Sequence, residues 1–290
     1  MKYRFIAEHA DRCAVVVLCR IMRVSTSAYY AWRKRPARLI SAETLQLYRR
    51  AKALFQQSRE SLGSRGLSQA LRKEGYAAGR YRARSLMKAL HLRVVQRQRY
   101  KVTTKSNPDH AIADNHLDQQ FNPTQPNQVW STDITYLRTA EGWLYLAIVL
   151  DLHSRRIVGL AMDRRMTQAL ITRALMMAIA LRKPDEGLLH HSDRGSQYTS
   201  KRYRKLLAQH GMISSMSGKG NCYDNAVVER FFGSLKHEWL AMVNHATRET
   251  MKADVNNYIR YYNGTRLHST LGYQTPIGYE KSQVKVSGRG

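Results

Sequence analysis

The residues from Trp143 to Leu150 are apolar almost without interruption and do not alternate with polar residues. A strand of this kind must be covered on both faces, because a sheet with one solvated face would show an alternation of period two. The patterns on either side of this run predict strands at 129–137, 157–162, 187–192 and 212–216, and helices at 166–181, 200–210, 226–240 and 247–262. This order of elements predicts an α/β fold with a central sheet.

The first hundred residues carry most of the positive charge, with 23 Lys and Arg against 5 Asp and Glu in a chain of formal net charge +27. Such an excess attracts polyanions, although it would also suit a ribosomal or membrane-surface protein. Two helix-turn-helix units are predicted there, over 12–33 with a break at Val24–Ser25 and over 67–90 with a turn at 75–79. An ordinary helical bundle with solvated basic faces is the alternative. The candidate DNA phosphate contacts in these units are Arg33, Lys34, Arg35, Arg82 and Arg84.

Changes in composition along the chain predict four regions. They are a basic helical region at 1–100, a linker at 101–127 with at most one short helix near 111–120, a core at 128–242, and a C-terminal helix and tail at 243–290. The tail is predicted to be irregular after Tyr273. Prolines and small polar residues gather in the predicted linker, which is typical of a connection between domains.

The cysteines and the apolar runs argue against a zinc site, a disulfide framework and a membrane span. Cys13, Cys19 and Cys222 have neither the spacing of a zinc site nor the number for a disulfide framework. The first residues do not form a signal peptide, and the apolar runs are too short to span a bilayer. We therefore expect a cytoplasmic protein without a membrane partner.

Three acidic residues stand in contexts that predict a shared site. Asp133 lies in the first predicted strand, Asp193 follows the fourth, and Glu229 lies one turn into a helix, with thirty-five residues between the last two. Ligands gather at the ends of central strands in α/β sheets, and Mg²⁺ prefers oxygen ligands such as carboxylates. In a basic chain, this cluster favours chemistry on nucleic acid. The alternative is three unrelated surface acids.

For the polar residues near these acids, the sequence leaves more than one role open. Lys236 shares an edge of its helix with the glutamate at about 100° per residue, so it is predicted to contact a phosphate, the alternative being a solvated helix face. Asn225 and Gln197 are predicted either to contact DNA or to make local turn and cap hydrogen bonds. Strand alternation points His190 and His191 to opposite faces, which predicts one in the core and one beside the site.

Two further groups are interpreted as structural. Asp151 ends a strand close to the predicted site, and we expect it to form a salt bridge with Arg155 or Arg156. We expect three tryptophans to anchor the core instead of stacking on bases, namely Trp130, Trp143 and Trp239.

Two motifs carry a resemblance to a known family. The motifs are DRGSQY at 193–198 and NAVVERFFGSLK at 225–236, which include the spacing from Asp193 to Glu229 and the lysine seven residues further on. Residues 128 to 240 resemble the catalytic core of the retroviral-integrase-like DDE transposases. Nearly the whole chain resembles the downstream-frame (OrfB-type) product of a bacterial insertion sequence.

The resemblance implies an RNase H-like fold, with a mixed five-stranded sheet flanked by helices. It implies that Asp133, Asp193 and Glu229 are catalytic and hold two Mg²⁺ ions, for which Mn²⁺ would substitute. The implied reaction is DNA cleavage by water and then strand transfer by a DNA 3′-OH, without a covalent enzyme intermediate. The implied partners are the terminal repeats of the element, target DNA, a second copy of the chain and the upstream-frame product, in the bacterial cytoplasm with the nucleoid.

The chain departs from relatives of this kind in two respects. It has no His/Cys zinc module such as retroviral integrases carry, and no long heptad zipper, which the upstream-frame product supplies. Two rival functions stay open. One is a non-catalytic DNA-binding or regulatory partner of the fused transposase, and the other is an RNase H-like nuclease that hydrolyses DNA without joining ends.

Overall fold

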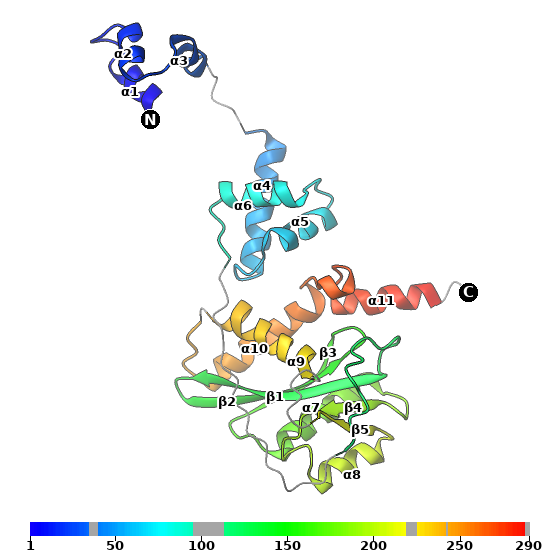
Figure 1. The fold of residues 1–290 in the computed structure, drawn as a ribbon. Helices are drawn as coiled ribbons and strands as arrows, with labels where there is room; N and C mark the ends of the chain where they lie inside the picture. Colours follow the sequence, from blue (N-terminus) through cyan, green and yellow to red (C-terminus); the bar gives the residue numbers. More distant parts are fainter. Residues whose placement is uncertain (35–39, 95–112, 219–224, 242, 288–290) are drawn as a thin grey trace. The chain divides into compact units, whose positions relative to one another are not determined.

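The computed structural model describes residues 1–34, 40–94, 113–218, 225–241 and 243–287 (Figure 1). Its chain divides into two compact units, Met1–Arg49 and Arg50–Gly290. We describe each unit by itself. The predicted regions 1–100, 101–127, 128–242 and 243–290 stay a prediction.

The first unit contains three short helices and a small core. Ser25 caps the third helix, because its side chain accepts a hydrogen bond from the Ala28 amide, and the predicted break at this position is confirmed. Ile6, Leu18 and Tyr29 are buried together between the helices. The helices are α1 (Lys2–Glu8), α2 (Val15–Ile21) and α3 (Thr26–Arg33).

A second group of helices begins with α4 (Ala42–Gln57), which the sequence patterns did not predict and which crosses the boundary between the units. It is followed by α5 (Ser64–Lys73) and α6 (Arg80–Ala89). Gly75, with φ of +87°, lies in the turn between α5 and α6, where a left-handed backbone favours glycine. The second predicted helix pair is therefore confirmed as a pair of packed helices.

The core of the second unit is a five-stranded sheet of order β3-β2-β1-β4-β5. β1, β2 and β3 pair antiparallel, whereas β4 pairs parallel with β1 and β5. The sheet is therefore mixed, as the resemblance implies. The strands are β1 (Val129–Thr139), β2 (Gly142–Asp151), β3 (Ile157–Asp163), β4 (Leu189–Ser192) and β5 (Ile213–Met216).

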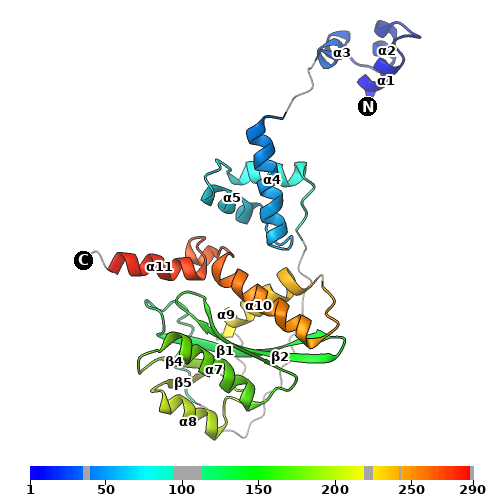
Figure 2. The ribbon, with the colours of Figure 1, turned by 180° about the vertical axis from the view of Figure 1, so that it is seen from behind.

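Helices cover both faces of this sheet (Figures 1 and 2). Leu146, Ile148 and Leu150 of β2 pack on the side of α9 and α10, and Ala147 and Val149 pack on the side of α7 and α8. The apolar run of β2 is thus buried from both sides, as predicted. The helices are α7 (Gln168–Arg182), α8 (Lys201–Gln209), α9 (Ala226–Ser234) and α10 (Arg248–Gly264).

Two segments differ from the predicted elements. The helix predicted at 226–240 ends as α9 and continues as a π-helical turn, η2 (Leu235–Leu240). The tail predicted to be irregular forms α11 (Pro276–Ser287), because Thr275 Oγ1 accepts a hydrogen bond of 3.0 Å from the Gly278 amide and proline suits the first helical position. Near 111–120, the described residues from 113 onward contain no helix. Within the described ranges, no helix is long and apolar enough to span a bilayer.

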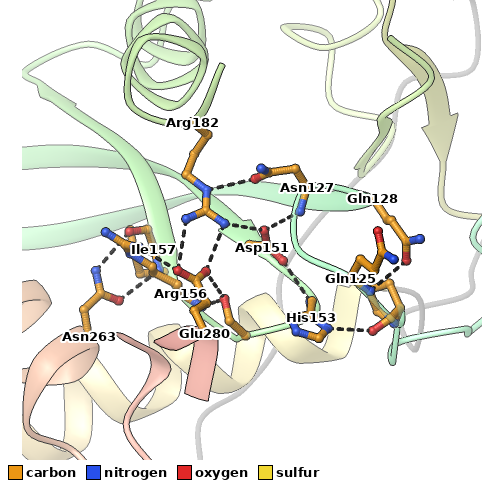
Figure 3. A network of polar contacts seen from close by, with 12 residues as sticks. Gln125, Asn127, Gln128, Asp151, His153, Arg156, Ile157, Arg182, Asn263 and Glu280 are labelled. Carbon is orange, nitrogen blue, oxygen red and sulfur yellow. Dashed lines mark hydrogen bonds and ion pairs between the residues drawn. The ribbon is translucent and has the colours of Figure 1, made fainter. Parts of the chain in front are cut away.

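A buried ion-pair network attaches α11 to the sheet (Figure 3). Asp151 is fully buried and pairs with Arg182 of α7 at 3.4 Å. Arg182 also pairs with Glu280 of α11 at 3.0 Å, and Arg156 pairs with Glu280 at 2.6 Å. The expected salt bridge of Asp151 with Arg155 or Arg156 was wrong, because these arginines point to other partners; Arg155 donates to Phe121 O and Asn122 Oδ1.

At the outer strand β3, the backbone of Ile157 is hydrogen-bonded by a side chain. Asn263 of α10 accepts a hydrogen bond of 3.0 Å from the Ile157 amide and donates one of 2.9 Å to the Ile157 carbonyl (Figure 3). Since β3 is the outer strand, the amide of Asn263 takes the place that a neighbouring strand would occupy. The C-terminal helices are therefore part of the core.

Candidate active site

The parallel pairing of β1 and β4 brings Asp133 and Asp193 to the same level. The last paired residues are Ser131 and His191, and each aspartate lies two residues beyond its strand's last pair. The Ile134 amide donates to Asp133 Oδ1 at 2.7 Å, and the Gly195 amide donates to Asp193 Oδ1 at 2.9 Å. The two carboxylates therefore stand together where β4 ends.

Glu229 reaches this position from α9. Ser131 of β1 donates a hydrogen bond of 2.9 Å to Asn225 Oδ1 at the start of α9, and Asn225 is buried. This bond joins the start of the helix to the strand that carries Asp133. The buried stripe of α9 packs on the sheet through Val228, Phe231 and Phe232, whereas Glu229 is exposed.

The three acids interact electrostatically. Burial raises the pKa of Asp133 well above its usual value, and the charges of Asp193 and Glu229 raise it further. The hydrogen bond from the Ile134 amide and the charge of Lys236 lower this pKa, but by less. Burial also raises the pKa values of Asp193 and Glu229. Burial lowers the pKa of Lys236, opposed by Tyr136 and Asp133. Ionised carboxylates thus repel each other in this site, which a bound cation would relieve.

The donor set fits a hard divalent cation, since all three acids offer carboxylate oxygens. Over the described ranges, however, no three His, Cys, Asp or Glu side chains are gathered into a ready-made metal site. The acids are therefore close enough to shift one another's pKa values, but they are not gathered around one point.

Two buried histidines support the strand that ends at Asp193. His190 Nε2 lies 3.1 Å from the Tyr203 hydroxyl, and burial lowers the pKa of His190 to about 3. His191 lies between two serines, with Nδ1 at 3.0 Å from Ser215 Oγ and Nε2 at 3.1 Å from Ser217 Oγ. Both rings thus form hydrogen bonds inside the protein, and neither is arranged as a metal ligand.

The predicted DNA contacts fall into three groups. Lys236 lies at the acids, and its Nζ is 5.0 Å from the centre of the Tyr136 ring. Gln197 is half-buried in the loop after Asp193, and Asn225 is buried in the hydrogen bond described above. Arg33 and Lys34 are exposed in the first unit and Arg82 and Arg84 on α6, whereas Arg35 lies outside the described residues.

One surface feature beside the acids was not predicted. Trp143 was expected in the core but is 46% exposed, whereas Trp130 is fully buried and Trp239 is half-buried, as expected. The Trp143 ring stands edge-to-face with that of Tyr136, which is 39% exposed, at 5.1 Å between centres. The signal in the sequence was the position of Trp143 next to the hairpin turn, beyond the buried part of the apolar run.

Models of known families match most of the chain. An integrase core domain matches residues 123–222, a second integrase core domain model matches 210–276, and an HTH-like domain matches 42–100. The first two models cover the sheet, the three acids and α10. The third covers α4, α5 and α6, which supports the helix-turn-helix interpretation of the second helix pair.

Curated relatives align over nearly the full length. The "Insertion element IS600 uncharacterized 31 kDa protein" of Shigella sonnei is 43% identical over 93% of this chain and 100% of its own length. The "Transposase InsF for insertion sequence IS3A" of Escherichia coli (strain K12) is 39% identical over 98% of this chain and 100% of its own. Among solved structures, the HTLV-2 integrase catalytic core domain in complex with magnesium (dimeric form) is 17% identical, with a TM-score of 0.45, over 54% of this chain and 98% of that one.

Proposed function

Because the chain belongs to the transposases of IS3-type insertion sequences, we propose that it cleaves and joins DNA at the ends of such an element. The reaction is a polynucleotidyl transfer. Water attacks the phosphodiester in the cleavage step, and the freed DNA 3′-OH attacks target DNA in the joining step. In this proposal water and the DNA 3′-OH are the nucleophiles, so no covalent enzyme intermediate forms.

One observation supports this function above the others. The parallel register of β1 and β4 brings Asp133, within β1, level with Asp193, just after the end of β4, and Glu229 of α9 raises the pKa of Asp133. A site for in-line phosphoryl transfer requires acids brought together in this way from separate elements. Three unrelated surface acids would not interact in this way, with the charges of Asp193 and Glu229 both raising the pKa of Asp133.

Asp133, Asp193 and Glu229 would hold two Mg²⁺ ions, or Mn²⁺ in their place. When bound, such ions activate the attacking oxygen and stabilise the leaving one. The protein's own part is to orient the carboxylates, which it does through the Ile134 and Gly195 amides and through the bond from Ser131 to Asn225. Lys236 supplies a cation beside Asp133 that suits a DNA phosphate.

The basic surfaces supply contact with longer stretches of DNA. Arg82 and Arg84 of α6 are exposed, as are Arg33 at the end of α3 and Lys34 directly after it. These four residues suit phosphate contacts, which position a protein without reading sequence. Two element ends must be joined in one reaction, so we infer that at least two copies assemble on DNA. The upstream-frame product is a further partner, and the cytoplasm with its nucleoid is where this DNA is found.

A cleavage and joining assay tests the proposal. The substrate is labelled DNA with the inverted repeats that flank the gene, and the expected result is nicked and joined product in Mg²⁺ or Mn²⁺ and none in EDTA. Asp193→Asn should abolish both products while the protein stays folded. Asp185→Asn makes the same chemical change at an exposed position and should keep them.

The two rival functions give different results in this assay. Nicking without joining would indicate a nuclease. An absence of both products in every metal, also as a fusion to the upstream-frame product, would indicate a non-catalytic DNA-binding partner.

A further inference from the structure

The β1–β2 hairpin carries an exposed pair of aromatic side chains, Tyr136 and Trp143, which are 39% and 46% exposed. In the described part of the chain after residue 112, the other exposed large hydrophobic side chains are aliphatic or methionine. Aromatic rings of this size are costly to leave in water, and tryptophan and tyrosine favour surfaces where they meet a partner. The pair therefore marks a candidate binding surface.

The strand register places both rings on one face of the hairpin. Tyr136 is paired with Tyr145 and Arg138 with Trp143, so Tyr136 and Trp143 are diagonal neighbours. Their ring centres are 5.1 Å apart at an interplanar angle of 85°. An edge-to-face pair uses only the edge of one ring in the contact, which leaves aromatic surface for a third ring.

The pair lies beside the catalytic acids. The Lys236 Nζ atom is 5.0 Å from the Tyr136 ring centre, and the same lysine perturbs the pKa of Asp133. Along β1, Tyr136 is three residues beyond Asp133, which is about 10 Å at the rise of a strand. That separation is about three nucleotides at roughly 3.4 Å per nucleotide of one strand. Strand alternation points Asp133 and Tyr136 to opposite faces of the sheet, so a DNA end whose phosphate lies at the acids would reach the rings around the edge of β1 beyond its last pair with β4, where Lys236 contacts Tyr136.

Cations accompany the rings. Lys236 stands over Tyr136, and the exposed Arg138 is the cross-strand neighbour of Trp143. Aromatic side chains with positive charge between them are the usual surface for single-stranded nucleic acid, because bases stack on the rings while cations hold the phosphates. A paired base inside a duplex has both faces covered, so only an unpaired base fits.

We propose that Tyr136 and Trp143 form a stacking surface for an unpaired nucleobase about three nucleotides from the reacting phosphate of the DNA end. This inference rests on the proposed function and adds a specific subsite to it. Stacking would hold the end of the DNA open and keep the reacting strand at the acids. If the rings only braced the hairpin, the affinity for DNA would not depend on whether the base is present.

The test uses the full chain and two DNA ends with unpaired terminal nucleotides, one intact and one abasic at those nucleotides. The wild-type protein should bind the intact end about 5- to 140-fold more tightly than the abasic end, which corresponds to about 1–3 kcal/mol of stacking per base. Trp143→Ala and Tyr136→Ala should bind both ends nearly equally, whereas Tyr136→Phe should keep the wild-type preference. Met177→Ala removes an exposed side chain from α7 and should also keep it.

A fluorescent base makes the contact visible. The emission of 2-aminopurine at the terminal nucleotides should be quenched by the wild-type protein and by Tyr136→Phe, and not by Trp143→Ala. The proposal is overturned if folded Trp143→Ala and Tyr136→Ala discriminate against the abasic end as strongly as the wild type does. In that case, cleavage and joining by the wild type would leave the proposed function intact, whereas their absence in Mg²⁺ and Mn²⁺ would overturn the function itself.

Discussion

Replacing Asn263 with leucine should destabilise the core, because two backbone groups at the sheet edge would lose their partner. The Ile157 amide and carbonyl bond to this side chain at 3.0 and 2.9 Å. Both residues are buried, with 9% of Asn263 and 3% of Ile157 exposed. Water therefore cannot easily replace the lost bonds.

The expected loss of stability follows from the two backbone groups that lose their hydrogen-bond partner. A buried backbone group left without a partner costs about 1–3 kcal/mol, so two would cost about 2–6 kcal/mol, and the apolar burial of leucine offsets part of this. We expect a net loss of about 2–4 kcal/mol in the free energy of unfolding, which for a core of this size lowers Tm by about 5–15 °C.

Thermal unfolding followed by far-ultraviolet circular dichroism measures this shift. Asn257→Leu is the matched control, because it makes the same change on the exposed side of the same helix and should alter stability by less than about 0.5 kcal/mol. If Asn263→Leu and Asn257→Leu unfold at the same temperature, the hydrogen bonds at the β3 edge do not stabilise the core, and the reasoning is refuted.

Two predictions concern buried charges. Burial and the neighbouring acids raise the pKa of Asp133, so its ionised form opposes folding. Asp133→Asn should raise the Tm of the metal-free protein at neutral pH. This gain should vanish below about pH 4, where the carboxyl group is protonated in the folded and the unfolded protein alike. Equal Tm values for the variant and the wild type at every pH would contradict this prediction. For Glu280, burial raises the pKa, but hydrogen bonds from Arg182, Ser154 and Arg156 outweigh burial and lower it overall. Glu280→Gln should thus cost about 2–3 kcal/mol above about pH 5, and the difference from wild type should shrink as the pH falls through the lowered pKa. A difference that does not change with pH would show that this carboxylate does not stabilise the fold through its charge.

The strands that build the site could be predicted because their signals are local. The run from Trp143 to Leu150 is apolar on both faces, and helices cover both faces of the sheet there, with every residue of β2 buried from Leu146 onward. Asp133 lies in one recognisable strand and Asp193 directly follows another, so the two acids were expected to share a site. Their level position depends on the register of β1 and β4, which only the structure shows.

The features that escaped prediction depend on tertiary packing. Asp151 pairs with Arg182, which is thirty-one residues away and also pairs with Glu280, instead of with the nearby arginines. The helix α11 is held by those contacts and by Thr275, although the threonine before a proline was a local signal that could have been used. Trp143 is exposed because the burial of β2 becomes continuous only beyond the first residues of the hairpin.

The joining of a labelled DNA 3′ end to target DNA tests the central claim most directly, because it requires the metal, the three acids and a free 3′-OH at once. We predict joined product for the wild-type chain and for Asp185→Asn in Mg²⁺ or Mn²⁺, and none for Asp133→Asn, Asp193→Asn or Glu229→Gln when each is folded. Joining that persists in EDTA, or in any one of these three folded variants, would contradict the assignment of these acids as the metal-binding catalytic site.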